Sequence, residues 1–180
     1  MTVDLRLVAA RVGKGDQAAF RQIVDLTRTP LYRLAARMLG NVADAEDALQ
    51  DAYVSAFRGL REGRYDGRSK LETWLYRVVA NTCIDQLRKR KPRADEAERE
   101  GRFDGLVTAE ARVALRELDE MLASLSANER AAIVLCHVEG LTVKEAAETV
   151  GTTEGAMEQR LLRARSALRK KSAEEEATGG

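Results

Sequence analysis

The chain has 180 residues, a net charge of +1 at pH 7 and 44% hydrophobic residues, which allow one globular domain or two small ones. Only 4% of the residues are aromatic, and the dominance of Ala, Leu, Arg and Glu favours helices, so we expect an all-α fold. No run approaches the roughly 20 apolar residues of a membrane span, and the charged start excludes a signal peptide. Two distant cysteines do not make a disulfide framework. We therefore expect a reduced, cytoplasmic protein without membrane insertion.

The distribution of charge is more informative than its sum. Six basic residues and one acid lie between Arg77 and Arg93, and six basic residues and no acid lie between Arg160 and Lys171. An acid-rich segment, 95–120, separates these two basic patches. Such a pattern is the electrostatic footprint of a protein that contacts a polyanion in two places.

Helical spacing begins near the N-terminus. Asp16 is suited to cap a helix that runs toward Pro30, where a further segment opens or bends, and Gly40 ends that segment. The next helix, 41–60, has an apolar side and an acidic start, where the helix dipole favours carboxylates. These carboxylates resemble part of a divalent-cation site, but no histidine or further acid completes the ligands, so a capped, solvated helix start explains them better.

A cationic loop, 61–70, leads into a long helix, 71–93, which Lys91–Pro92 ends. We expect Ser69 and Glu72 to form a capping box at its start. One side of the helix is apolar, and the other carries cations, an amide and, at its border, the only tryptophan. Cations attract phosphate, aromatic faces stack on bases and an amide bonds base edges, so this face suits single-stranded nucleic acid.

A structural reading of the same helix stays open. An amphipathic helix often has a basic face that is only solvated. In that reading Trp74 belongs to the core and holds the loop 61–70 against the helix.

The second half follows a charged segment, 93–108, that we interpret as a flexible linker. A helix begins near Ala109, with an apolar face formed by Val113, Leu115, Leu118, Met121, Leu122 and Leu125. Capping boxes at Ser126 and Thr142 start two more helices. Gly151 ends the second of them, and Thr152 or Thr153 caps a long basic helix. This order predicts a helix-turn-helix that binds duplex DNA, against the alternative of an ordinary helical hairpin.

Residues with catalytic potential do not form a recognisable site. His137 is the only histidine, and its neighbour Cys136 points about 100° away on a helix, so the two do not chelate one metal. Cys83 lies on an apolar side and is interpreted as a small buried hydrophobe. The sequence has no phosphate-binding glycine loop, nucleophile elbow or metalloprotease motif. We expect no catalytic residue, no metal and no cofactor.

Three stretches resemble the extracytoplasmic-function (ECF) subfamily of the sigma-70 family of RNA polymerase sigma factors. The stretch 44–57, DAEDALQDAYVSAF, is similar to the helix of region 2 that docks on the polymerase. The stretch 71–90, LETWLYRVVANTCIDQLRKR, is similar to the part of region 2 that melts the promoter and reads the −10 element. The stretch 125–170 resembles region 4. Three motifs in this order are specific, whereas a lone helix-turn-helix is not.

The resemblance implies a transcription initiation factor of two small helical domains. Region 2 would occupy 1–92, a flexible linker 93–108, region 4 109–171, and an acidic disordered tail 172–180. Region 2 would bind the clamp of core RNA polymerase and hold the opened −10 strand of promoter DNA. Region 4 would bind the −35 duplex and the polymerase flap. The family also implies an anti-sigma factor as regulator.

The resemblance and the residue pattern together assign three sets of site residues. Polymerase docking is assigned to Asp44, Asp47, Gln50, Asp51, Val54 and Phe57. Capture of the −10 single strand is assigned to Tyr65, Lys70, Trp74, Arg77, Asn81 and Arg88, with the loop and Asn81 around a flipped base. Readout of the −35 duplex is assigned to Thr153, Glu158, Gln159, Leu162 and Arg163, with phosphate contacts from Arg160, Arg165 and Arg169. At Glu158 the family often has a basic residue; here the carboxylate accepts from cytosine or pairs with Arg163.

Three other classes of protein are alternatives. A helical repressor or activator would share both basic patches but would not bind core polymerase. A recombinase needs a nucleophilic Ser or Tyr among arginines, and no such constellation surrounds Tyr65 or Tyr76. A purely structural interaction protein would leave both basic patches unexplained.

Overall fold

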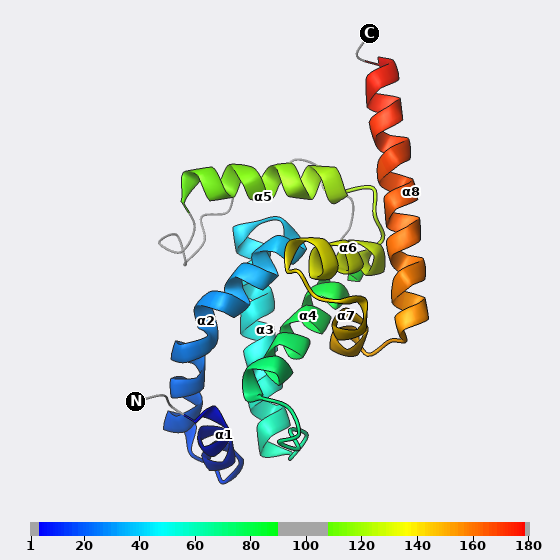
Figure 1. Ribbon diagram of the computed structural model, residues 1–180. Helices are drawn as coiled ribbons and strands as arrows, with labels where there is room; N and C mark the ends of the chain where they lie inside the picture. The colour runs from blue at the N-terminus through cyan, green and yellow to red at the C-terminus, as the bar shows by residue number, and fades with distance from the viewer. Residues whose placement is uncertain (1–3, 90–107, 179–180) are drawn as a thin grey trace.

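A computed structural model of the chain describes residues 4–89 and 108–178 (Figure 1). All regular elements in these two ranges are helical, as the sequence predicts. The first range holds α1 (Leu5–Gly13), α2 (Gln17–Leu39), α3 (Val42–Arg61) and α4 (Leu71–Lys89). The second holds α5 (Ala109–Leu122), α6 (Ala127–Ile133), a π-helical turn (Val134–Val138), α7 (Val143–Val150) and α8 (Glu154–Thr178).

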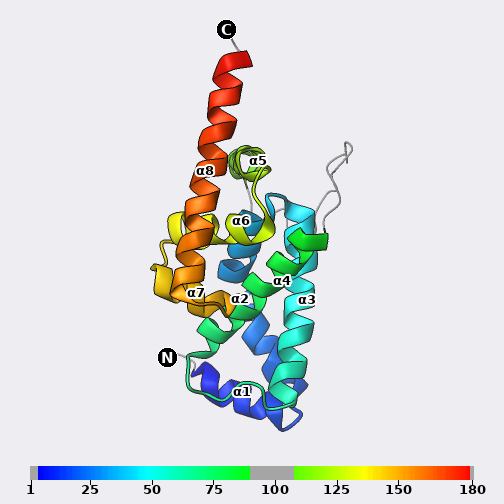
Figure 2. The ribbon, with the colours of Figure 1, turned by 90° about the vertical axis from the view of Figure 1, so that its right-hand side faces the viewer.

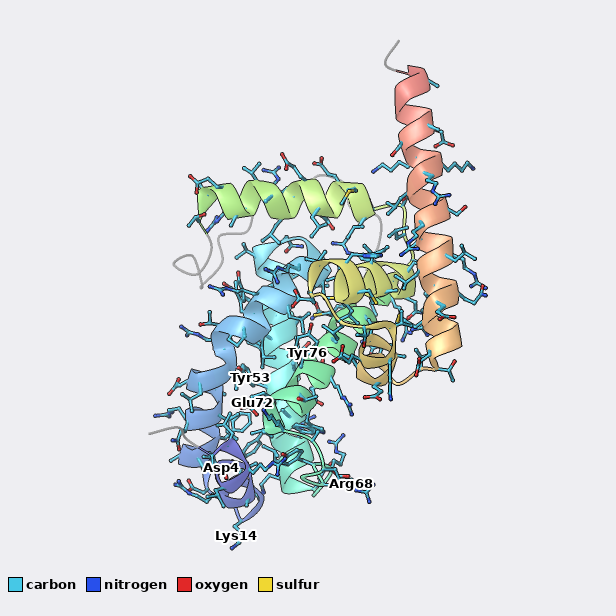
Figure 3. The ribbon with its side chains drawn as sticks, in the orientation of Figure 1. Asp4, Lys14, Tyr53, Arg68, Glu72 and Tyr76 are labelled. Atoms are coloured by element: carbon cyan, nitrogen blue, oxygen red, sulfur yellow. The ribbon has the colours of Figure 1, made fainter. Side chains whose placement is uncertain are left out.

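Helices α2, α3 and α4 pack side by side into a bundle, and α1 closes the end of the bundle near the loop before α4 (Figures 1 and 2). Apolar residues at helical spacing supply the interior, where Ile23, Leu49, Leu71 and Leu75 are buried. Figure 3 shows Tyr53 between the helices, and its hydroxyl lies 2.9 Å from the Thr27 hydroxyl of α2. Removing one of the buried leucine side chains would cost about 2–5 kcal/mol of unfolding free energy.

The sequence locates most helix ends in this bundle. The Asp16 side chain accepts from the Ala19 N–H, and Gly40 ends α2 in the left-handed conformation, as expected. The segments before and after Pro30 form one continuous helix, because buried side chains such as Ile23 and Leu34 hold both parts. Helix α1 was not predicted, although Asp4 caps it and its apolar residues have helical spacing.

Helix α4 starts at Leu71 as expected, but its cap lies one residue later than predicted. The helix begins at Leu71, and the Lys70 carbonyl accepts from the Trp74 N–H at 3.1 Å. Lys70 therefore occupies the N-cap position, and the expected capping box of Ser69 and Glu72 is wrong. The Ser69 carbonyl instead accepts from the Tyr65 hydroxyl at 2.8 Å, which fixes the loop before the helix.

Helices α6, α7 and α8 form the second compact group. Both predicted capping boxes are confirmed, with Ser126 on Glu129 and Thr142 on Glu145. The helix that starts at Ser126 changes to a π-helical turn before Gly140. Gly151 ends α7 in the left-handed conformation.

The last helix is longer than the sequence predicts. Its cap is Thr153, whose hydroxyl accepts from the Ala156 N–H at 3.2 Å. The tail expected to be disordered, 172–180, continues α8 as far as Thr178, and residues 179–180 lie outside the described ranges. An i,i+4 pair of Lys170 and Glu174, 3.9 Å apart, supports this projecting end (Figures 1 and 2).

Helix α5 is amphipathic but only partly packed. Leu122 is fully buried, whereas Val113 and Met121 are 55% and 51% exposed. The expected apolar face therefore packs mainly at its C-terminal end, beside α2. The Asp119 side chain lies so close to Gly40 that a β-carbon there would stand 2.4 Å from that of Asp119. The expected linker lies almost wholly in 90–107, outside the described residues.

Candidate nucleic-acid interface

The polar face predicted for α4 exists. Arg77, Asn81 and Arg88 lie on the side away from the buried Leu75, Val79 and Cys83. Asn81 is exposed and its amide donates to the Arg77 carbonyl at 2.9 Å. This arrangement aligns two guanidinium groups and one amide along about three turns of helix.

An aromatic contact between Tyr65 and Trp74 packs the loop before α4 against that helix. Trp74 is half-buried, and its ring lies 5.5 Å from that of Tyr65, centroid to centroid. A β-carbon on Gly59 of α3 would stand 3.1 Å from the Trp74 ring, so the indole packs directly on the α3 backbone. This supports the structural role of Trp74, which holds the loop against the helices. Lys70 and Arg68 are exposed, and Arg68 points outward from the loop (Figure 3).

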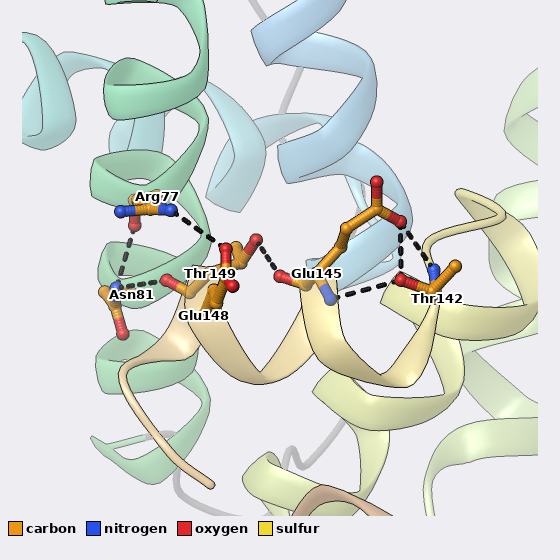
Figure 4. A network of polar contacts seen from close by, with 6 residues as sticks. All are labelled: Arg77, Asn81, Thr142, Glu145, Glu148 and Thr149. Carbon is orange, nitrogen blue, oxygen red and sulfur yellow. Dashed lines mark hydrogen bonds and ion pairs between the residues drawn. The ribbon is translucent and has the colours of Figure 1, made fainter. Parts of the chain in front are cut away.

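The second half of the chain contacts the polar face of α4 (Figures 1 and 4). The Asn81 amide donates to the Thr149 carbonyl of α7 at 3.2 Å. The Arg77 guanidinium lies 3.6 Å from the Glu148 carboxylate. Nearer the end of α4, Arg88 donates to the side-chain oxygen of Asn128 at 2.9 Å. Sequence reasoning did not predict these contacts, because nothing local in either helix marks them.

Two side chains of the second half, the buried Arg130 and the partly buried Glu139, contact the first half. Arg130 of α6 is 3% exposed; it donates to the Met38 carbonyl at 2.7 Å and pairs with Asp119 at 2.7 Å. Glu139, which follows the π-helical turn, accepts from Arg37 at 2.7 Å and from the Tyr76 hydroxyl at 3.3 Å. Figure 3 labels Tyr76 at α4. Burial and the Glu139 carboxylate raise the pKa of Tyr76, so its hydroxyl stays a donor.

The front of α8 is exposed to solvent. We define this front by five exposed residues: Thr153, Glu158, Gln159, Leu162 and Arg163. Leu162 is 63% exposed in spite of its apolar side chain. The helix is held by its other side, where Met157, Leu161 and Ala164 are buried. Of the three predicted phosphate-binding arginines, Arg169 is exposed, Arg160 is half-buried, and Arg165 lies 3.3 Å from the His137 ring.

Of the six residues of α3 predicted to dock on the polymerase, four are exposed and two are engaged within the fold. Asp47, Gln50, Asp51 and Val54 are exposed and form a single stripe at i, i+3, i+4 and i+7. Asp44 is engaged in the helix cap, where it accepts from the Asn41 amide at 2.7 Å. Phe57 packs against Phe20, with ring centroids 5.0 Å apart. The exposed stripe is therefore narrower than the set of six residues predicted for docking.

Cys83 of α4 is a buried free thiol. Burial raises the pKa of the Cys83 thiol to about 12, so it stays protonated and unreactive. No three His, Cys, Asp or Glu side chains gather around a possible metal site in 4–89 or 108–178. No helix in the same ranges is long and apolar enough to cross a membrane.

Comparison with known proteins identifies the two halves. Residues 23–93 match the family Sigma-70 region 2, and residues 115–168 match the family Sigma-70, region 4. The ECF RNA polymerase sigma factor SigW of Bacillus subtilis is 36% identical over 89% of this chain and 92% of its own length. The chain belongs to the ECF subfamily of sigma-70 factors. It is a transcription initiation factor that binds core RNA polymerase and promoter DNA.

Two solved structures have the same fold. CnrH, in complex with the cytosolic domain of CnrY, superposes with a TM-score of 0.64 and 30% identity over 97% of this chain and 99% of its own. RpoE of Bartonella quintana, in complex with the anti-sigma factor NepR, superposes with a TM-score of 0.56 and 25% identity over 84% and 94% of the two chains. These likenesses confirm the predicted all-α fold with regions 2 and 4.

Proposed function

We propose that this sigma factor divides promoter recognition among three separate surfaces. The exposed stripe of α3 (Asp47, Gln50, Asp51 and Val54) docks on the clamp of core polymerase. The polar face of α4, with Lys70 of the loop, captures the −10 non-template strand. The front of α8 reads the −35 duplex while region 4 contacts the polymerase flap. In this scheme region 2 occupies 1–92, a linker 93–108 and region 4 109–171.

The alignment of Arg77, Asn81 and Arg88 on one face of α4 is the observation that carries the proposal. Guanidinium groups bind the phosphates of a strand, and the amide between them is placed to bond a base edge. The half-buried Trp74 positions the loop that closes the base pocket, so stacking by its indole is secondary. Permanganate mapping of the opened −10 element, set out at the end of the Discussion, tests the proposal directly.

The readout of the −35 element gives a prediction of its own. Gln159→Ala or Glu158→Ala will change which −35 sequence is preferred, at about 1–3 kcal/mol for each lost bidentate contact. Arg169→Ala will weaken binding to all sequences alike, because a phosphate contact positions the protein without specifying a base. Selection of duplexes from a randomised −35 library measures both effects. A uniform loss from all three substitutions would place the readout face elsewhere.

We propose further that a protein anti-sigma factor regulates the chain. Support comes from CnrH, solved with the cytosolic domain of CnrY, and from RpoE, solved with NepR. The exposed Val113 and Met121 of α5 and Leu162 of α8 offer apolar surface to such a partner. A pull-down from uninduced cells will recover this partner with the chain. Recovery of core polymerase alone would contradict the proposal.

The chain itself is proposed to act without catalysis and in the cytoplasm, where core polymerase is. Its buried Cys83 and the structural surroundings of Tyr76 support the first part of this statement. Nucleotide chemistry then belongs entirely to the polymerase.

A further inference from the structure

The π-helical turn after α6 sends two polar side chains to different parts of the fold. The Glu139 N–H donates to the Val134 carbonyl at 2.9 Å, five residues earlier, which is the π-helical pattern. The Glu139 side chain accepts from Arg37 of α2 and Tyr76 of α4. His137, two positions earlier, instead contacts α8. Turns of this kind often occur at functional sites, and this one leaves His137 exposed beside α8.

The partner of His137 on α8 is Arg165. Its guanidinium group lies 3.3 Å from Nε2 of the imidazole, and both side chains are exposed. A guanidinium group has only donors, so in this contact Nε2 accepts and the imidazole is neutral, with its proton on Nδ1. Within 4–89 and 108–178 neither side chain forms an ion pair with a carboxylate. The positive charge of Arg165 is therefore available to an anion from outside the chain.

The other charged groups near the turn do not take part in this contact. Burial raises the pKa of the neighbouring Cys136 thiol in spite of Arg165, so the thiol stays neutral. Among the charged groups of the elements packed on the turn, Lys144 is exposed, Arg37 pairs with Glu139, Glu148 with Arg77 and Arg130 with Asp119, and Glu129 and Glu145 accept within their capping boxes. Imidazole is the side chain that changes charge between about pH 5 and 8, and His137 is the only histidine of the chain.

Arg165 lies on the same side of α8 as part of its front. It follows Glu158 by seven residues and Leu162 by three, so these three side chains form one stripe. Arg169, a proposed phosphate contact, continues the stripe. Seven residues of helix rise about 10 Å, and the major groove is about 12 Å wide. When the front of α8 meets base edges in the groove, Arg165 and His137 therefore lie level with the phosphates at its edge.

We propose that His137 and Arg165 together bind one phosphate of the −35 duplex, and that this binding draws a proton from solvent onto the imidazole. Protonation turns Nε2 from an acceptor into a donor, so the bond between the two side chains is exchanged for bonds from both to the phosphate oxygens. The anion between them offsets the repulsion of the two cations. Because the complex holds one proton more than the free chain, affinity for the duplex rises as the pH falls. The inference rests on the proposed role of the front of α8.

Four forms of the full-length protein test the contact: the parent, His137→Gln, His137→Lys and Arg169→Ala. The probe is a fluorescent duplex selected from the randomised −35 library, titrated at about pH 6 and pH 8 and at several salt concentrations. Glutamine keeps an acceptor for Arg165 but takes up no proton, whereas lysine is charged at both pH values. Circular dichroism will show the same helix content for all four forms at both pH values.

The expected results follow from one additional phosphate contact. Between about pH 8 and pH 6 the parent will gain about three- to eightfold in affinity at about 0.1 M salt, and its salt slope will steepen by about 0.9. His137→Gln will bind as the parent does at pH 8 and will not gain affinity at pH 6. His137→Lys will bind at pH 8 as tightly as the parent does at pH 6. Arg169→Ala will bind more weakly but keep the full pH dependence, because it removes a different phosphate contact.

The outcomes separate this inference from the proposed function. Equal affinity of the parent at both pH values, or a pH dependence that remains in His137→Gln, overturns the contact. A preferred −35 sequence that changes with pH places His137 on a base and also overturns the phosphate contact. If Gln159→Ala and Glu158→Ala leave the preferred sequence unchanged, the proposed readout face is wrong, and the pH dependence of the parent and His137→Gln still decides whether His137 binds a phosphate.

Discussion

Replacing Asp47 and Asp51 together by lysine will weaken binding to core RNA polymerase by at least about tenfold. Both side chains are exposed on α3 and away from its buried face, so the fold will be kept. The substitutions reverse the charge of the stripe, and like charges brought together across an interface cost several kcal/mol. Titration of labelled core polymerase with the variant measures the change in affinity. High salt will reduce this loss of affinity less than it would reduce the effect of an ion pair exposed to solvent.

The control for this prediction is a second pair of acids. Glu110→Lys with Glu117→Lys on α5 makes the same change in net charge at exposed positions outside the stripe. This pair will leave the affinity within about twofold of the parent, since surface substitutions away from a contact have small effects. Equal losses in both double variants would mean that net charge, and not docking by α3, sets the affinity.

Replacing Asn81 by alanine will reduce the formation of open promoter complexes by roughly ten- to hundredfold. A base that leaves the duplex loses stacking worth about 1–3 kcal/mol, which the pocket on α4 has to offset, and each 1.4 kcal/mol is a factor of ten. The rate at which competitor-resistant complexes appear on a promoter measures this step. Polymerase affinity and −35 duplex binding will change little, because Asn81 belongs neither to the exposed stripe of α3 nor to the front of α8.

The Asn81 amide also donates to the Thr149 carbonyl of α7 at 3.2 Å. The substitution therefore removes a contact between the two halves as well as the proposed base contact. Arg77→Ala is the comparison, because its partner Glu148 is more than half exposed and holds the halves only weakly. If both variants open promoters at the parent rate, the base pocket does not involve this face of α4.

Local signals in the sequence predicted most of the helices. Capping residues such as Asp16, Ser126 and Thr142 act within one turn, so they are visible without knowledge of the fold. The sides of α4 were also predicted correctly, because a helix of known phase fixes which residues share a face. The same holds for the exposed front of α8.

Features set by tertiary packing were not predicted. Nothing near Asn81 marks the Thr149 carbonyl as its partner, since the two residues are 68 positions apart in sequence. Pro30 was expected to open or bend a segment, but contacts on both sides keep α2 continuous. The end of α8 was expected to be disordered from its acidic composition, although the pair of Lys170 and Glu174 gave a helical signal there.

The hydrogen-bond donors of the candidate site were predicted, but their contacts with the second half of the chain were not. Arg77, Asn81 and Arg88 lie where the helical phase places them, and all three also contact the second half of the chain. Arg130 and Glu139, which make the most buried contacts between the halves, had no signal in the sequence as residues of the interface. A charged residue in the apolar run after Ser126 was the one available hint of a buried partner.

Permanganate reactivity of promoter thymines tests most directly whether this chain opens DNA for core polymerase. The chain and core polymerase are combined on a promoter found by mapping the transcripts that forced expression induces. The account predicts reactive thymines at the −10 element with the parent chain, none with core polymerase alone, and a strong decrease with Asn81→Ala. Binding of the chain to core polymerase and to the duplex without any reactive thymine would contradict the account and favour a regulator that acts on closed DNA.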